Sequence, residues 1–302
     1  MNGILPLWKE KGMTSHDCVF KVRKILKMKK VGHTGTLDPD VEGVLPICLG
    51  RATKLAEYIM NSGKVYEGEV TIGFSTTTED ASGDIVEQQP VSSRISRKDI
   101  LSVLQSLTGE IMQTPPMFSA VKVNGKRLYE YARQGIEVER PSRKVTIHQL
   151  DLLDEREWFE GETIQFSFRA SCSKGTYIRT LAVMIGERLG YPAHMSKLVR
   201  TSSGGFDKQQ CITLDELKQL QEKSAVSAIV QPLERGVEHL PKWTINDTLA
   251  KKVMNGSVLD MPADWPEKAT EAAVFSEENL LAIYKLHPDK PGKVKPVKVL
   301  AD

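Results

Sequence analysis

Hydrophobic residues recur at helical spacing near the start of the chain. Val19, Val22 and Leu26 are three or four residues apart, which places their side chains on one face of a helix. A capping box of the form Thr-x-x-Asp begins at Thr14. We therefore predict a helix from Thr14 to about Lys27, with an outer face rich in lysine and arginine.

Apolar and polar residues alternate from Tyr66 to Phe74, which is typical of a half-buried strand. The same pattern predicts two more strands, at 145–153 and 163–170. Helical spacing predicts further helices, at 52–61, 96–107, 128–134 and 176–189. Asn124-Gly125 is typical of a hairpin turn. Because strands and helices alternate irregularly, we predict an α+β fold with a mixed sheet.

The pattern changes near residue 236. Pro232, Gly236 and Pro241 interrupt it, and the following sequence contains a small helix at 247–254 and a β-type run at 280–286. The last residues are rich in lysine. We predict a domain boundary here, followed by a small basic module.

The composition is that of a globular protein: 302 residues, 40% of them hydrophobic and 26% charged. The apolar stretch at the N-terminus stops at Lys9, which is too short for a signal peptide, and we find no membrane-spanning segment. The four cysteines form no C-x-x-C pair, which argues against a zinc ribbon or a redox dithiol. We expect a cytoplasmic protein.

The net charge is only +2, but the charges are unevenly distributed. Residues 1–54 carry ten lysines and arginines against five acidic residues, residues 122–144 carry seven against three, and residues 169–200 carry six against one. Brought together by folding, these stretches would form one electropositive face, as in nucleic-acid binders. The alternative is a set of separate solvated surfaces.

The sequence lacks the motifs of common cofactors. It has no phosphate-binding loop, no dinucleotide fingerprint and no H-E-x-x-H, which argues against phosphoryl transfer, hydride transfer and zinc hydrolysis. Residues 38–49 begin like a calcium-binding loop but end in Leu49, where calcium needs a glutamate. We therefore expect neither a cofactor nor a metal.

Two segments concentrate glycine and reactive side chains. GHTGTLDP at 32–39 places Asp38 in a loop after the basic helix, and CSKGTYIRTL at 172–181 places Tyr177 and Arg179 where a helix begins. The first suits a catalytic carboxylate and the second suits contacts to phosphates or bases. Each also has a purely structural interpretation, as a turn before proline and as a capped helix start.

Together these segments resemble the bacterial tRNA pseudouridine-55 synthases, the TruB family, which isomerise the T-loop uridine of tRNA. The resemblance rests on five segments: GHTGTLDPDVEGVLPICLGRATK (32–54), KVYEGEVTIGFSTTTEDASG (64–83), RLYEYARQGIEV (127–138), CSKGTYIRTLA (172–182) and HMSKLVRTSSGGF (194–206). It covers most of residues 1–235. One departure is Glu10, where the family usually has proline after the lysine.

The resemblance implies the pseudouridine synthase fold, in which helices flank a mixed, largely antiparallel central sheet and a small C-terminal β-barrel of the PUA type follows. It implies a catalytic domain at 1–235, with an RNA-binding insertion at about 112–144, and a PUA-like RNA-binding domain at 236–302. The implied partner is the T-arm stem-loop of tRNA. We expect a monomer that needs no cofactor and does not bind a membrane.

The resemblance also implies the catalytic residues. Asp38 would be the nucleophile, Arg179 its charged partner, and Tyr66 would stack on the uracil and take part in the proton transfer at C5. Because isomerisation involves no net redox change or hydrolysis, an ionised carboxylate suffices. It can attack C1′, add to C6 or remove a ribose proton to give a glycal, and these routes stay open. Tyr66 also suits core packing.

Four further residues carry over as substrate-binding positions, and Lys174 is added to them on its own chemistry. Tyr177 and Leu198 would line the uridine pocket, and His33 would contact the T-loop. Asp80 would join the network of Arg179. Lys174 suits a phosphate contact. A stacked T-loop uridine is reached only by flipping it out, at a cost of about a few kcal/mol.

Two other functions compete with this interpretation. One is a noncatalytic tRNA-binding or RNA-folding protein that uses the same basic face. The other is a nucleoside hydrolase that releases free uracil. Loss of pseudouridine formation with retained binding in an Asp38→Asn variant would exclude the first, and the absence of base release would exclude the second.

Overall fold

The computed structural model describes residues 1–300, which fold as two compact units. The first unit contains residues 1–40, 44–62 and 203 onward. The second contains residues 41–43 and 63–202. None of the helices within the described residues is both long and apolar enough to cross a membrane.

A sheet with the strand order β14-β4-β13-β11-β8 forms the second unit. Its strands are β4 (Lys64–Ile72), β8 (Gly109–Gln113), β11 (Arg143–Leu152), β13 (Ile164–Cys172) and β14 (Ala193–Ser203). The pairs β4-β13, β13-β11 and β11-β8 are antiparallel. β14 also pairs in parallel with the start of β3 (Glu42–Leu49). The sheet is therefore mixed and largely antiparallel, which confirms the prediction.

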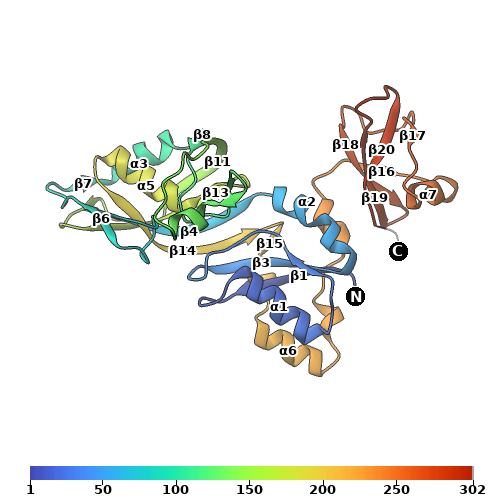
Figure 1. The fold of residues 1–302 in the computed structure, drawn as a ribbon, viewed down its shortest axis with the longest axis horizontal. Coiled ribbons are helices and arrows are strands. Elements are labelled where there is room, and N and C mark those ends of the chain that lie inside the picture. The colour runs from blue at the N-terminus through green and yellow to red at the C-terminus, as the bar shows by residue number, and fades with distance from the viewer. Residues whose placement is uncertain (301–302) are drawn as a thin grey trace. The chain divides into compact units, whose positions relative to one another are not determined.

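Two helices, α3 (Arg97–Ser106) and α5 (Ile178–Leu189), pack on this sheet and on each other (Figure 1). α3 begins at a capping box in which Ser96 and Asp99 bond each other's backbone N–H groups. Along β4 the even-numbered residues are buried, so the alternation that predicts this strand also defines its core face.

Shorter elements extend from the second unit. β5 (Phe74–Thr76) pairs with β6 (Ile85–Gln88), and β7 (Ile95–Ser96) pairs with β12 (Trp158–Phe159). Residues 114–142, here called the excursion, leave the sheet between β8 and β11. The excursion contains the hairpin of β9 (Lys122–Val123) and β10 (Lys126–Arg127), followed by α4 (Leu128–Ala132). Its turn residues Asn124 and Gly125 have φ values of 50° and 83°, as the predicted hairpin requires.

The first unit begins with a strand and the predicted amphipathic helix. β1 (Gly3–Lys9) and β2 (Val31–His33) both neighbour β3 in a sheet, and α1 (Ser15–Leu26) packs with α6 (Leu214–Glu222). The capping boxes of both helices are formed. Val19, Val22 and Leu217 belong to the hydrophobic core between these elements. The helical spacing of apolar residues at the start of the chain thus corresponds to the buried face of α1.

The predicted helix at 52–61 is helical throughout, but its first part is not α-helical. Residues Gly50–Leu55 form a 3-10 helix, and only α2 (Ala56–Asn61) is α-helical. The hydroxyl of Thr53 donates to the carbonyl of Gly50 at 2.7 Å, within the tight turn. Because the Thr53 hydroxyl satisfies the Gly50 carbonyl, this carbonyl does not depend on the N–H donor four residues later that an α-helix would supply.

Residues 242–299 form a curled five-stranded sheet in the order β16-β18-β19-β20-β17. The elements here are β16 (Lys242–Thr244), α7 (Asp247–Met254), β17 (Leu259–Asp260), β18 (Glu271–Ser276), β19 (Asn279–Leu286) and β20 (Lys293–Val299). Before it lie β15 (Phe206–Asp207) and three 3-10 turns (Lys208–Gln210, Val226–Ala228, Leu233–Val237). The sheet confirms a small C-terminal β module of the PUA-like kind. The boundary at residue 236 stays a prediction.

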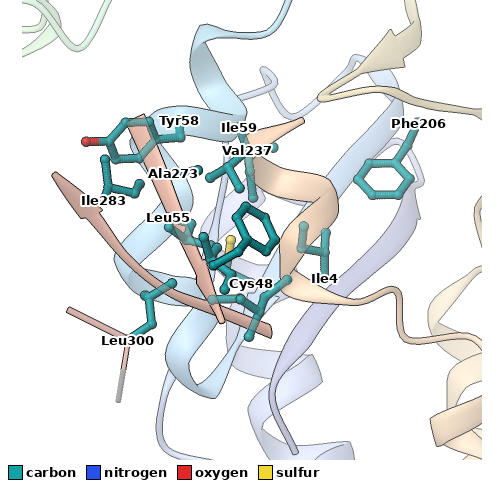
Figure 2. Packing of buried hydrophobic residues seen from close by; sticks show 14 of the residues in the cluster. Ile4, Cys48, Leu55, Tyr58, Ile59, Phe206, Val237, Ala273, Ile283 and Leu300 are labelled. Atoms are coloured by element: carbon teal, nitrogen blue, oxygen red, sulfur yellow. The ribbon is translucent and has the colours of Figure 1, made fainter. Parts of the chain in front are cut away.

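The outer face of this sheet shares a hydrophobic cluster with α2 (Figure 2). Ile283 and Leu300 lie with Leu55 and Ile59 in one set of buried side chains. The hydroxyl of Tyr58 also donates to Glu271 at 2.6 Å. The C-terminal sheet is therefore packed onto the rest of the first unit.

Candidate active site

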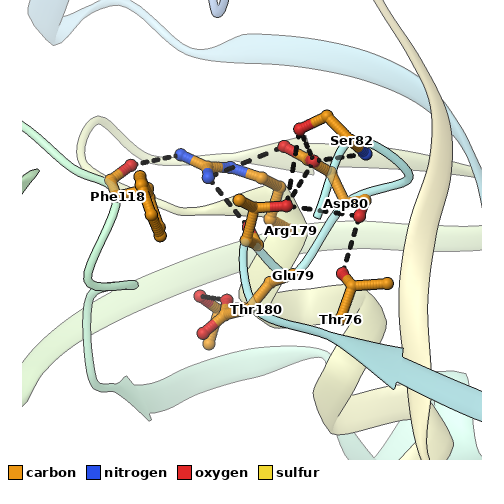
Figure 3. A network of polar contacts seen from close by, with 8 residues as sticks. Thr76, Glu79, Asp80, Ser82, Phe118, Arg179 and Thr180 are labelled. Carbon is orange, nitrogen blue, oxygen red and sulfur yellow. Dashed lines mark hydrogen bonds and ion pairs between the residues drawn. The ribbon is translucent and has the colours of Figure 1, made fainter. Parts of the chain in front are cut away.

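A buried arginine lies at the start of α5 (Figure 3). The Nη1 and Nη2 atoms of Arg179 donate to the carbonyl oxygens of Thr78 and Phe118, at 2.9 and 2.8 Å. Nη1 also lies 3.7 Å from Oδ2 of Asp80. The side chain of Arg179 is only 7% exposed. Such a buried guanidinium is stable because carbonyls and a carboxylate compensate its lost hydration.

Asp80 is held by a small network of hydroxyl groups. Its Oδ1 atom accepts hydrogen bonds from the hydroxyls of Thr78 and Ser82, both at 2.6 Å, and from the Ser82 N–H at 3.0 Å. Its other oxygen faces Arg179. The carboxylate is therefore fixed in orientation by one oxygen and paired with the guanidinium through the other.

The segment that carries Asp80 is attached to β14. The Met195 N–H donates to the carbonyl of Glu79 at 3.0 Å, and the Ala81 N–H donates to the carbonyl of Met195 at 3.1 Å. The Thr180 hydroxyl donates to the Glu79 carboxylate at 2.6 Å. Burial raises the pKa of Glu79 above its ordinary value, although Thr180 and Arg179 oppose the shift. This acid beside the Arg179 network was not among the residues predicted from the sequence.

Tyr66 and Leu198 lie near each other on the sheet. Tyr66 is opposite Ala170 on β13 and is 7% exposed. Gly68, two residues along β4, has no side chain, and a Cβ there would lie 3.3 Å from Cδ1 of Leu198. Residues i and i+2 of a strand share a face, so Leu198, together with Phe168, lies over the face of β4 that also carries Tyr66. This arrangement can offer an aromatic ring and an aliphatic wall to a flat base.

Tyr177 precedes the first residue of α5 as its N-cap. The Arg143 guanidinium lies 4.9 Å from the centre of its ring, within cation-π range. Lys174, in the turn before it, is exposed. The turn therefore presents an aromatic ring and a solvated cation close to Arg179, as contacts to an RNA strand require.

Asp38 lies in the loop between β2 and β3 and is half-buried. Both of its neighbours are anchored. The Leu37 N–H donates to the Ser15 hydroxyl at 2.8 Å, and the Pro39 carbonyl accepts from the Lys9 ammonium at 3.1 Å and the Gly12 N–H at 2.9 Å. The main chain on both sides of Asp38 is thus held by hydrogen bonds. The tie from Lys9 forms although Glu10 replaces the family's proline.

His33 ends β2 in the same loop region. Its Nδ1 atom accepts a hydrogen bond from the Gly35 N–H at 3.2 Å. The ring is half-buried and oriented by its own loop.

The eight predicted site residues are distributed over both units. Asp38 and His33 belong to the first unit, and the other six belong to the second. Within the second unit the structure brings Arg179 and Asp80 into an ion pair. Gln113 and Arg143, which both contact the turn before α5, escaped sequence reasoning. The sequence carries no signal for Gln113, because its burial and its contacts to Tyr177 arise only in the folded chain.

Comparisons with known proteins agree with this fold. Residues 23–178 match the model of the TruB family pseudouridylate synthase N-terminal domain, and residues 179–238 match a tRNA pseudouridylate synthase B C-terminal domain. The tRNA pseudouridine synthase B of Geobacillus thermodenitrificans is 59% identical over 300 residues, with 99% of each chain covered. That of Bacillus subtilis is 58% identical over 303 residues, covering 99% of this chain and 98% of the relative.

Solved structures show the same likeness. A crystal structure of a Cbf5-Nop10-Gar1 complex matches with a TM-score of 0.74 and 31% identity over 99% of this chain and 84% of the other. A structure of an H/ACA RNP bound to a substrate RNA containing 2′-deoxyuridine matches with a TM-score of 0.72 and 28% identity, over 99% and 85% of the two chains. The fold is that of the enzymes that convert uridine to pseudouridine. The chain belongs to the TruB family of pseudouridylate synthases, and its reaction is uridine isomerisation in tRNA.

Proposed function

We propose that this enzyme isomerises uridine 55 in the T-loop of tRNA, with Asp38 as the catalytic nucleophile. The observation that carries the proposal is the anchoring of Leu37 and Pro39 on either side of Asp38. A carboxylate held in this way needs little reorganisation, at a small cost in free energy, when a flipped uridine binds. An ionised carboxylate is a competent nucleophile for this chemistry.

The reaction needs no external reagent. The N1–C1′ bond of uridine breaks, the uracil turns, and a C5–C1′ bond forms. C5 loses its proton and N1 gains one, so atoms and charge balance. Asp38 assists by attack at C1′, by addition at C6 or by removal of a ribose proton. Arg179 stabilises the negative charge that develops as the base departs. Tyr66 stacks on the uracil and serves the proton transfer at C5.

The remaining site residues recognise the RNA. Tyr177 and Leu198 line the uridine pocket, His33 contacts the T-loop, Lys174 contacts phosphate, and Asp80 keeps Arg179 in place. The basic face of α1, the excursion and the C-terminal sheet supply further contacts to the T-arm. We propose a cytoplasmic monomer that acts without a metal or cofactor.

The test is an Asp38→Asn variant assayed on an unmodified tRNA transcript labelled at C5 of uridine. We expect release of the label to fall by at least about a thousandfold while tRNA affinity stays within about tenfold. Asp40→Asn is the matched control, because Asp40 lies in the same loop with an exposed side chain. Turnover that persists in Asp38→Asn would remove Asp38 from this role. Activity on a transcript whose position 55 is cytidine would contradict the choice of site.

A further inference from the structure

Gln113 and Arg143 stand at the two ends of the excursion. They are directly opposite one another in the antiparallel register of β8 and β11. Both side chains reach the turn at 175–177, which leads into α5. The residues that flank the excursion therefore contact the turn that leads to Arg179.

The side-chain amide of Gln113 bonds both the N–H and the carbonyl of Tyr177. The Tyr177 N–H donates to Oε1 of Gln113 at 3.0 Å, and Nε2 of Gln113 donates to the Tyr177 carbonyl at 3.2 Å. The side chain is 1% exposed. A primary amide presents an acceptor and donors in one plane, so it can pair with the N–H and the C=O of a single residue much as a neighbouring strand would. A buried residue in this position cannot serve RNA directly.

Arg143 holds the same turn from another direction. Its guanidinium donates to the Gly175 carbonyl and lies over the Tyr177 ring. Gly175 has a φ of +82°, and a Cβ there would lie 3.3 Å from Cζ of Arg143. Glycine therefore provides both the left-handed turn and the space for the guanidinium.

The excursion itself supplies a third contact. Phe118, five residues beyond Gln113, accepts a hydrogen bond from Arg179 through its carbonyl. The contacts thus run in sequence from Gly175 through Tyr177 to Arg179. Since each contact arises in the excursion or at its ends, the position of this segment and that of the active-site turn are linked.

We propose that Gln113 and Arg143 are positioning residues that fix Tyr177 and, through the start of α5, Arg179 for catalysis. The proposal rests on the proposed function, in which Tyr177 and Arg179 serve the flipped uridine. Loss of the Gln113 contacts displaces the turn without removing an RNA-binding surface, because the Gln113 side chain is buried. The expected effect is on kcat, because small misplacements of catalytic groups cost up to about a hundredfold in rate.

The first test is Gln113→Met, which keeps length and apolar volume but removes both hydrogen bonds. We expect kcat on a T-arm stem-loop to fall about tenfold to a hundredfold, with RNA affinity within about threefold of the parent. Arg143→Lys, which keeps the charge but loses the planar stack, should lower kcat in the same direction. Unchanged kcat in a folded Gln113→Met variant, or a loss of affinity alone, would overturn the proposal.

Gln113→Glu separates positioning from mere destabilisation. The introduced carboxylate still accepts from the Tyr177 N–H but repels its carbonyl, whereas the protonated carboxyl donates to that carbonyl as the amide does. Because burial raises the pKa of such a carboxyl, the kcat of the variant relative to the parent should rise as pH falls from 8 to about 6. A ratio that stays constant across this range would contradict the proposal.

The matched control is Glu110→Gln, the reverse exchange three residues earlier on β8. Glu110 is exposed and pairs with Lys144 at the surface, so its variant should keep the parent's kcat at every pH. Assaying the parent enzyme beside the variants separates failure of the proposed function from failure of the positioning role. A parent that forms no pseudouridine in the T-loop contradicts the proposed function, whereas an active parent with unaffected variants contradicts only the positioning role.

Discussion

The ammonium group of Lys9 donates a hydrogen bond to the carbonyl oxygen of Pro39 across 3.1 Å, although the two residues are thirty positions apart. Lys9 is fully buried at the end of β1, and it also donates to the carbonyl of Glu10. A buried cation is costly unless it is well bonded. The hydrogen bond from the Lys9 ammonium group therefore holds Pro39, the residue after Asp38, against the end of β1.

Lys9→Met should loosen the Asp38 loop. The variant keeps the apolar length of the side chain but leaves the Pro39 carbonyl with one donor fewer, so we expect kcat to fall about tenfold or more. The loss of stability should be about 1–3 kcal/mol. Single-turnover rates at saturating tRNA and urea unfolding measure the two effects. Lys11→Met, an exposed change in the same turn, should leave kcat as it is; equal losses in both variants would contradict the explanation.

Asp80→Asn should weaken the orientation of Arg179. The amide is isosteric, but it cannot neutralise the guanidinium, and it gives up one of the carboxylate's acceptor oxygens. We expect kcat to fall about tenfold, with little change in tRNA affinity. Asp84→Asn, in the same loop and exposed, is the control. An active Asp80→Asn variant with the parent's kcat would show that the ion pair serves structure only.

The half-buried Glu79 predicts a pH dependence of stability. Burial raises its pKa in the folded state, so the native protein binds a proton that the unfolded chain has already released. Just above the ordinary value of 4.5 the free energy of unfolding should therefore fall as pH rises toward the folded-state pKa. Glu79→Gln keeps an acceptor for Thr180 and should remove this contribution. Urea unfolding between pH 4.5 and 7 measures the difference; parallel pH profiles would refute it.

Gly186 marks the closest approach of α5 to the following turn. A Cβ at this position would lie 2.3 Å from the Cβ of Ala193 and 2.8 Å from the Tyr191 carbonyl. Gly186→Ala should therefore destabilise the protein by about 1–3 kcal/mol, despite the better helix propensity of alanine. Gly63→Ala is the control, since nothing lies within 4 Å of its added Cβ. Urea midpoints compare the two, and an equally stable Gly186→Ala variant would show that the helix shifts freely.

Local signals in the sequence predicted much of the fold. The capping boxes at Thr14 and Ser96 begin helices as expected, and Asn124-Gly125 forms the predicted turn. These signals work because the interacting groups are within a few residues of each other. The hairpin strand β6 was not predicted, because all four of its residues are exposed and carry no alternation.

The candidate site was predictable only in part. Its residue types were recognised from motifs, but the contacts that hold them connect distant segments. Gln113 and Tyr177 are 64 residues apart, and Arg179 and Thr78 are 101 apart. Side-chain bonds to a distant main chain leave no periodic pattern, so only folding shows them.

The cluster that joins Ile283 and Leu300 to Leu55 and Ile59 bears on any attempt to shorten the protein. In a chain ending near residue 240, the side chains of Leu55 and Ile59 would form an exposed hydrophobic patch, which promotes aggregation. Weak tRNA binding by such a fragment would be uninformative about the lysines of the C-terminal sheet. Replacing those lysines one at a time, with the sheet left in place, is the cleaner way to learn what that sheet touches.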